Sequence, residues 1–123
     1  MSSKPTPRPT RITLHQRSRL LEVAFDTGET FSMSCEYLRV FSPSAEVRGH
    51  GPGQEVLQIG KENVNITRID PVGHYAVRLH FDDGHHTGLY SWSVLYELGT
   101  QQSANWNTYL QRLKAAGHQR KGE

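Results

Sequence analysis

Apolar and polar residues alternate along several short stretches of the chain, which is the pattern of half-buried β-strands. The clearest strand is predicted for residues 75–81, where every second residue is apolar and points to one side: Tyr75, Val77, Leu79 and Phe81. Weaker alternation predicts further strands at residues 12–14, 21–25, 31–33 and 64–66, and a brief return strand is expected at 87–90. Turns are predicted at 27–29, 70–73 and 83–84.

Other segments have apolar residues three and four positions apart, which predicts helices. A short helix is expected over 35–41 after a Ser34 cap, because Tyr37, Leu38 and Phe41 share one face. The remaining helices are expected at 94–98, before Gly99, and from a Ser103 cap to about Gly117, with Trp106, Leu110 and Leu113 on one face.

No long crossover helix separates consecutive strands, so the strands should pair in antiparallel fashion. We therefore predict an α+β fold: a small twisted, mostly antiparallel β-sheet with short helices and a C-terminal helix packed on one face. The 123 residues suffice for one core. The predicted organisation is a flexible lead-in of residues 1–10, a single domain of residues 11–117 that contains a mobile loop at 42–58, and a fraying tail of residues 118–123.

The charge balance does not demand a polyanionic partner, because 14 basic residues stand against 12 acidic ones. Basic residues do gather near both ends, which leaves nucleic-acid binding as a weaker alternative. Cys35 is the only cysteine, so a disulfide within the chain and a thiolate-rich zinc site are excluded. Cys35 is expected to be a buried apolar residue, and the protein to be cytoplasmic and without a membrane span.

Potential metal ligands gather at the end of the clearest strand and in the turn that follows it. Imidazole and carboxylate groups suit zinc or iron, and we place a candidate metal site at His85, His86 and Asp82, with His85 foremost because it follows the turn glycine. Adjacent side chains on an extended segment diverge, so one ion would need a further ligand from elsewhere, such as Cys35 or His50. The alternative is that these residues are exposed or stabilise the turn. No residue is predicted to be catalytic.

One run of residues resembles a known family. The segment Asp83-Gly84-His85-His86-Thr87-Gly88-Leu89-Tyr90-Ser91-Trp92, read with Leu38-Arg39 and Ser42-Pro43-Ser44, is similar to the gamma-butyrobetaine hydroxylase-like N-terminal domain family over residues 13–98. In gamma-butyrobetaine and trimethyllysine hydroxylases, such a domain precedes a catalytic double-stranded helix and holds a structural zinc with three cysteines and one histidine. In other proteins, a similar domain is joined to Mrp-type ATPases, which are linked to iron–sulfur cluster assembly.

The chain departs from this family where the resemblance implies zinc ligands. The expected cysteines are replaced around Ser42, Ser44 and Val47, and only a histidine, His85 or His86, remains at the matching turn. The Cys3His zinc site is therefore not expected here, and these 123 residues are expected to hold only the N-terminal module and not the oxygenase domain. These departures favour a non-enzymatic accessory or protein-interaction module that serves a metalloprotein or an iron–sulfur system. The alternative is an iron or zinc protein that uses His85.

Overall fold

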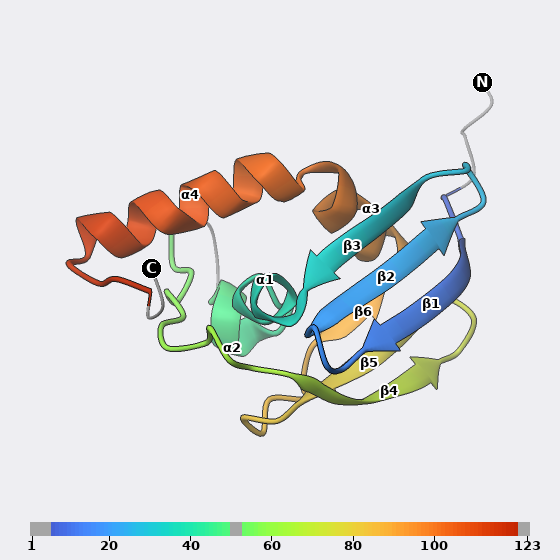
Figure 1. Cartoon of the computed structure of the whole chain (residues 1–123), viewed down its shortest axis with the longest axis horizontal. Helices are drawn as coiled ribbons and strands as arrows, with labels where there is room; N and C mark the ends of the chain where they lie inside the picture. The colour runs from blue at the N-terminus through green and yellow to red at the C-terminus, as the bar shows by residue number, and fades with distance from the viewer. Residues whose placement is uncertain (1–5, 50–52, 121–123) are drawn as a thin grey trace.

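Within residues 6–49 and 53–120, the part of the chain that this computed structural model describes, the strands form two antiparallel sheets of three strands each (Figure 1). The sheets have the orders β1-β2-β3 and β4-β5-β6, so each strand pairs with its neighbour in sequence. The predicted α+β class and antiparallel pairing are confirmed, although the strands divide between two sheets. The strands are β1 (Pro9–His15), β2 (Leu20–Phe25), β3 (Thr30–Ser34), β4 (Ile66–Val72), β5 (Ala76–Phe81) and β6 (Leu89–Ser91).

The first sheet contains the predicted hairpin. In β2, Leu21, Val23 and Phe25 are buried and the residues between them are partly exposed, as the alternation predicted. Gly28 supplies the positive φ of 91° that the turn before β3 requires. The lead-in was predicted to end at residue 10, but β1 already begins at Pro9; residues 1–5 of the lead-in lie outside the described residues.

The second sheet corrects one predicted turn and one predicted side-chain direction. β4 continues through Pro71, where the sequence predicted a turn, because an edge strand tolerates a residue without an N–H donor. The chain turns instead at Gly73, which has a φ of 58°. Tyr75 belongs to this turn and is 60% exposed rather than inward-facing, whereas Val77 and Leu79 are buried as predicted.

One apolar core joins both sheets and two of the helices. Its fully buried members include Leu21 of β2, Leu79 of β5, Leu38 of α1 (Cys35–Val40) and Leu95 of α3 (Trp92–Thr100). Burying a side chain of this size contributes about 1.5–3 kcal/mol. Since the residues come from all parts of the chain, neither sheet has a separate core of its own.

The helices begin and end close to the predicted positions, with two corrections. α1 follows the predicted cap, because the Ser34 side chain accepts a hydrogen bond from the Tyr37 N–H. The predicted loop at 42–58 contains a four-residue helix, α2 (Ala45–Arg48), which Ser44 caps in the same way; residues 50–52 lie outside the described residues. The last helix, α4 (Gln102–Ala115), starts before the predicted Ser103 cap and has no side-chain cap.

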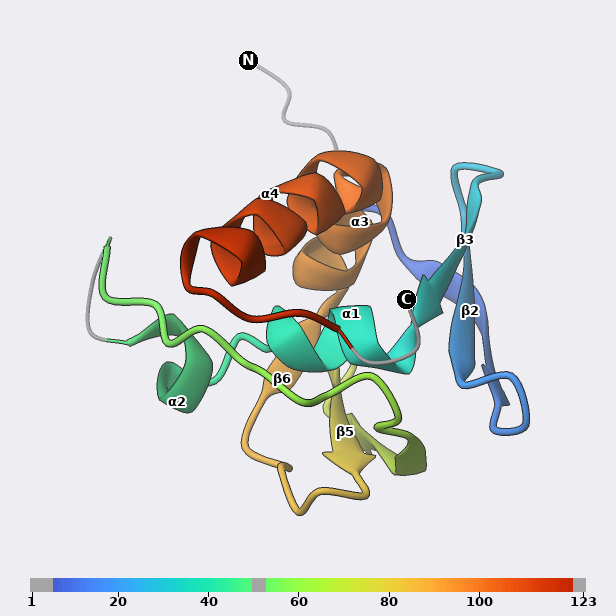
Figure 2. The ribbon, with the colours of Figure 1, turned by 60° about the vertical axis from the view of Figure 1, so that its left-hand side comes forward.

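α4 packs against α1, with Tyr109 and Leu113 of α4 and Val40 of α1 forming a second small apolar cluster (Figure 2). After α4, Gly117 adopts a φ of 78°, and the chain folds back beneath the helix. Where the sequence predicted a fraying tail, Arg120 instead binds Glu36 with two N–H···O contacts of 2.6 and 2.8 Å. Residues 121–123 lie outside the described residues.

No helix in the described part of the chain has both the length and the apolar character needed to cross a bilayer.

Candidate functional site

The turn between β5 and β6 positions the histidines that the sequence singled out. Gly84, with a φ of 91°, lets the chain reverse, and the Phe81 N–H then donates to the His85 carbonyl oxygen at 2.9 Å. This closed turn directs the His85 side chain inward. His85 is 6% exposed, whereas its neighbour His86 is exposed.

His85 meets Ser42, which lies 43 residues earlier in the chain. The Ser42 Oγ and His85 Nε2 atoms are 2.8 Å apart, and Ser42 has no exposed surface. The Ser42 Oγ also accepts a hydrogen bond from the Ser44 N–H at 3.2 Å. Gly88 permits this approach, because a Cβ atom at Gly88 would lie 2.4 Å from the Ser42 Oγ. The structure thus pairs His85, and not His86, with the position at which the resemblance implied a missing cysteine.

Asp83 holds the same turn against α1 and the segment before β4. Its carboxylate accepts hydrogen bonds from Arg39 Nε at 2.9 Å, from Lys61 Nζ at 2.6 Å and from the His85 N–H at 3.2 Å. Burial alone would raise the pKa of Asp83, but these donors outweigh it and lower the pKa to about 2. Asp83 is therefore a negatively charged anchor of the turn near neutral pH.

A pair of hydroxyl groups extends this polar network to α2. Ser44 Oγ lies 2.7 Å from Thr87 Oγ1, which donates to Glu46 Oε1 at 3.1 Å. The other oxygen of Glu46, Oε2, is 3.5 Å from His85 Nδ1. We call the set of Ser42, Ser44, Glu46, His85 and Thr87 the turn network.

Glu46, His85 and Ser42 stand in the order of a hydrolase triad, an arrangement that the sequence did not predict. Two features distinguish the turn network from such a site. Ser42 presents no surface that a substrate could reach, and the contact between Glu46 and His85 is longer than a good hydrogen bond. In this arrangement the three side chains fix the turn against α2.

The surroundings of His85 disfavour its protonated form. Burial removes water from the imidazole, and the Arg39 guanidinium is nearby, so together they lower the pKa of His85 despite the opposing effects of Glu46 and Asp83. His85 is therefore neutral near neutral pH.

The free energy of unfolding is expected to fall as the pH is lowered from neutral through the ordinary imidazole value of 6.5. Because the pKa of His85 is depressed in the folded chain, the unfolded chain binds the proton first as the pH drops below the ordinary value of 6.5. Urea unfolding followed by tryptophan fluorescence at several pH values measures this slope. His85→Gln should flatten it relative to wild type; equal slopes in wild type and His85→Gln would refute the assignment to His85.

The three predicted metal ligands have separate partners. His85 contacts Ser42, the Asp82 carboxylate accepts the Asn65 N–H at 3.1 Å, and His86 Nδ1 lies 3.0 Å from the Gly84 carbonyl oxygen. Within residues 6–49 and 53–120, no three His, Cys, Asp or Glu side chains form a group suited to a metal ion. The metal assignment stays a prediction, which elemental analysis of protein purified without an affinity tag tests.

Cys35, the other ligand considered, is fully buried as predicted, and burial raises the pKa of its thiol. His50 lies outside the described residues. The sequence did not indicate Ser42 or Arg39 as partners of the turn, since neither residue type nor local spacing distinguishes them from other serines and arginines. Only the family resemblance indicated this pairing, because it places Ser42 near the position of a cysteine that binds zinc in the family.

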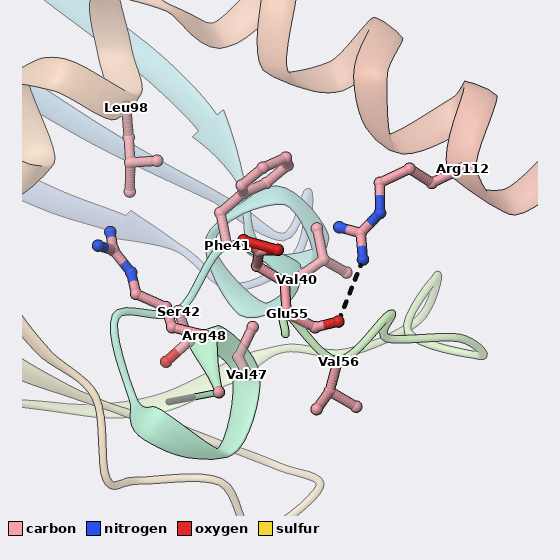
Figure 3. A pocket seen from close by; sticks show the side chains of 10 residues that line it. Val40, Phe41, Ser42, Val47, Arg48, Glu55, Val56, Leu98 and Arg112 are labelled. Carbon is pink, nitrogen blue, oxygen red and sulfur yellow. Dashed lines mark hydrogen bonds between the residues drawn. The ribbon is translucent and has the colours of Figure 1, made fainter. Parts of the chain in front are cut away.

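Beside the turn network lies an open hollow of about 500 Å³, which we call the helix hollow (Figure 3). It is bordered by the end of α1, α2, the segment at 55–56, α3 and α4. Ser42 is one of the residues that border it, but its side chain has no exposed surface and contacts His85. The apolar part of its lining consists of Val40, Phe41, Val47, Val56 and Leu98.

Comparison with known proteins supports the sequence resemblance. A family model described as "Gamma-butyrobetaine hydroxylase-like, N-terminal" matches residues 12–96. No curated protein shows a significant match to the chain.

Solved structures share the fold. One protein, known from an NMR solution structure, has 55% sequence identity and a TM-score of 0.81, over 98% of this chain and 89% of its own. A second NMR solution structure has 43% identity and a TM-score of 0.82, over 97% and 94%. A crystal structure from Acidithiobacillus ferrooxidans, of a protein with unknown function in the DUF971 family, has 39% identity and a TM-score of 0.65, over 79% and 98%.

Proposed function

Since the chain belongs to the gamma-butyrobetaine hydroxylase-like N-terminal family, we propose that it is a non-enzymatic module that binds a partner protein through the helix hollow. The observation that carries this proposal is the contrast between two neighbouring features. The histidine and serine that could perform chemistry are enclosed, while an open, mostly apolar hollow adjoins them. Exposed hollows of this kind, with an apolar floor and a polar rim, are typical of binding sites.

The family supplies the choice of partner to test first. Similar domains are joined to Mrp-type ATPases, so we propose a metalloprotein or a component of iron–sulfur cluster assembly as the partner. Nucleic-acid binding receives less support, because two of the terminal arginines are neutralised within the chain. Arg11 pairs with Glu22 at 3.0 Å, and Arg120 pairs with Glu36.

A pull-down with two matched surface variants tests this function. Val56 is 52% exposed at the rim of the helix hollow, and Leu89 is 39% exposed on β6. We expect wild type and Leu89→Asp to recover the same specific partner and Val56→Asp to lose it, because a carboxylate at Val56 would disfavour an apolar contact. Failure of wild type to recover a specific partner, or equal recovery by both variants, would refute the proposal.

A separate measurement tests the absence of catalysis. We expect a fluorophosphonate probe, which reacts with activated serines, to leave Ser42 unlabelled because the side chain is fully enclosed. Stoichiometric labelling of Ser42 that disappears in His85→Gln would make the protein a serine hydrolase instead.

A further inference from the structure

The helix hollow carries positive charge above its apolar floor. Arg48 of α2 and Arg112 of α4 lie on opposite sides of Phe41 (Figure 3), and Glu55 is the acidic residue in the lining. These three side chains leave an excess of positive charge at an otherwise apolar surface. A ligand that fills the hollow must therefore satisfy two requirements, apolar contact and negative charge.

The two arginines are not neutralised by ion pairs. Within residues 6–49 and 53–120, Arg48 forms no ion pair and no side-chain hydrogen bond, and the Arg112 guanidinium reaches only the Glu55 carbonyl oxygen, at 3.5 Å. A carbonyl group is neutral, so it leaves the charge of Arg112 uncompensated. By contrast, Arg39, Arg68 and Arg120 each have a carboxylate within 3 Å.

The Glu55 carboxylate already accepts a backbone hydrogen bond within the chain. Its two oxygens accept the Gly53 N–H at 3.0 and 3.2 Å, and the backbone N–H groups of Glu55 itself and of Gly53 lower the pKa of this carboxyl group. Glu55 therefore stays charged and lies near Arg112, but it does not form a direct ion pair with either arginine. Among the residues that the structure describes, both guanidinium groups keep donors free for a carboxylate from another molecule.

The helix hollow is large enough for one side chain of a partner protein and for parts of the residues next to that side chain. Its volume of about 500 Å³ falls within the range of roughly 300–1,000 Å³ that is usual for ligand sites. Its apolar lining comes from three helices and two connecting segments, so an inserted side chain would be contacted from several directions.

We propose that the helix hollow binds an acidic segment of a partner protein, in which a large apolar side chain enters the hollow and flanking carboxylates pair with Arg48 and Arg112. This inference rests on the proposed interaction function and specifies the chemistry of the partner. The apolar side chain supplies most of the affinity, and the two arginines select the charge of the flanking residues.

Peptide titration tests the proposal directly. The probe is a fluorescein-labelled decapeptide with one central phenylalanine flanked by aspartate and glutamate, and its twins carry lysine in place of the acids or serine in place of the phenylalanine. We expect the acidic phenylalanine peptide to bind, each twin to bind at least about tenfold more weakly, and the affinity to fall as salt rises. Amide shifts in ¹⁵N spectra should map to Val47, Val56 and Leu98.

Two double variants separate charge recognition from general charge effects. Arg48→Gln with Arg112→Gln should weaken binding of the acidic peptide roughly tenfold. Arg17→Gln with Lys114→Gln removes the same charge at exposed positions away from the helix hollow and should change binding little. Circular dichroism and urea unfolding check that both variants are folded.

The outcomes distinguish this inference from the proposed function. Equal binding of the acidic and lysine peptides, or equal weakening by the two double variants, would overturn the charge recognition. If either of these results were found and the pull-down still recovered a partner that Val56→Asp loses, the interaction function would stand while the acidic chemistry would fall. Direct binding of dodecanoate, with the same amide shifts and no binding of any peptide, would assign the hollow to small amphiphilic anions and overturn the proposal.

Discussion

Replacing His85 with alanine is expected to lower the free energy of unfolding by about 3 kcal/mol. The substitution removes a buried ring that contacts Phe81 and leaves the Ser42 hydroxyl without its imidazole partner. It also leaves Glu46 without its contact to the imidazole at the end of the turn network. Urea unfolding at neutral pH, followed by tryptophan fluorescence, measures the change.

The neighbouring histidine provides the control for this prediction. His86 is exposed and stacks against His80 with 5.8 Å between ring centroids, so His86→Ala should cost no more than about 0.5 kcal/mol. A loss of similar size in both variants would show that the buried hydrogen bond to Ser42 has no special weight.

Replacing Arg120 with alanine is expected to lower the free energy of unfolding by about 2 kcal/mol. Glu36 is only 6% exposed, and the substitution leaves its carboxylate without the two hydrogen bonds from the guanidinium. The variant also removes the guanidinium from the face of the Trp106 ring, 5.3 Å from its centroid. Thermal and urea unfolding measure the loss.

A double-mutant cycle with Glu36→Gln isolates the ion pair. If Glu36 and Arg120 interact as the structure shows, the two substitutions together should cost at least about 1 kcal/mol less than the sum of the single ones. Gln119→Ala, one residue earlier and exposed, should change stability little. Additive effects of Glu36→Gln and Arg120→Ala would contradict the coupling.

Much of the fold could be predicted because its causes are local. The alternation in β2 and β5, the positive φ at Gly28 and the Ser34 cap all depend on residues a few positions apart. The errors arise where the sheet overrides a local signal. The sequence predicted a turn at Pro71, but its place on an edge strand makes the missing N–H harmless, and that place is a property of the sheet.

The candidate site was predicted less completely. The sequence marked His85 as the residue to test, but could not show that its ring is buried while that of His86 is exposed. Adjacent side chains diverge on an extended segment, so a difference between them was expected. Which of them faces inward depends on how Gly84 turns the chain and on which surface lies behind it.

The sequence by itself determined the α+β class, the hairpins, the burial of Cys35 and the kinship of the 83–92 segment, because these follow from periodicity, turn chemistry and a specific run of residues. Only the tertiary structure decided that Ser42 pairs with His85 and Glu36 with Arg120, and that two arginines without an ion pair in the described part of the chain face the helix hollow. These contacts join residues 43 and 84 positions apart, and the packing of the two sheets and α4 around α1 brings them within hydrogen-bond distance.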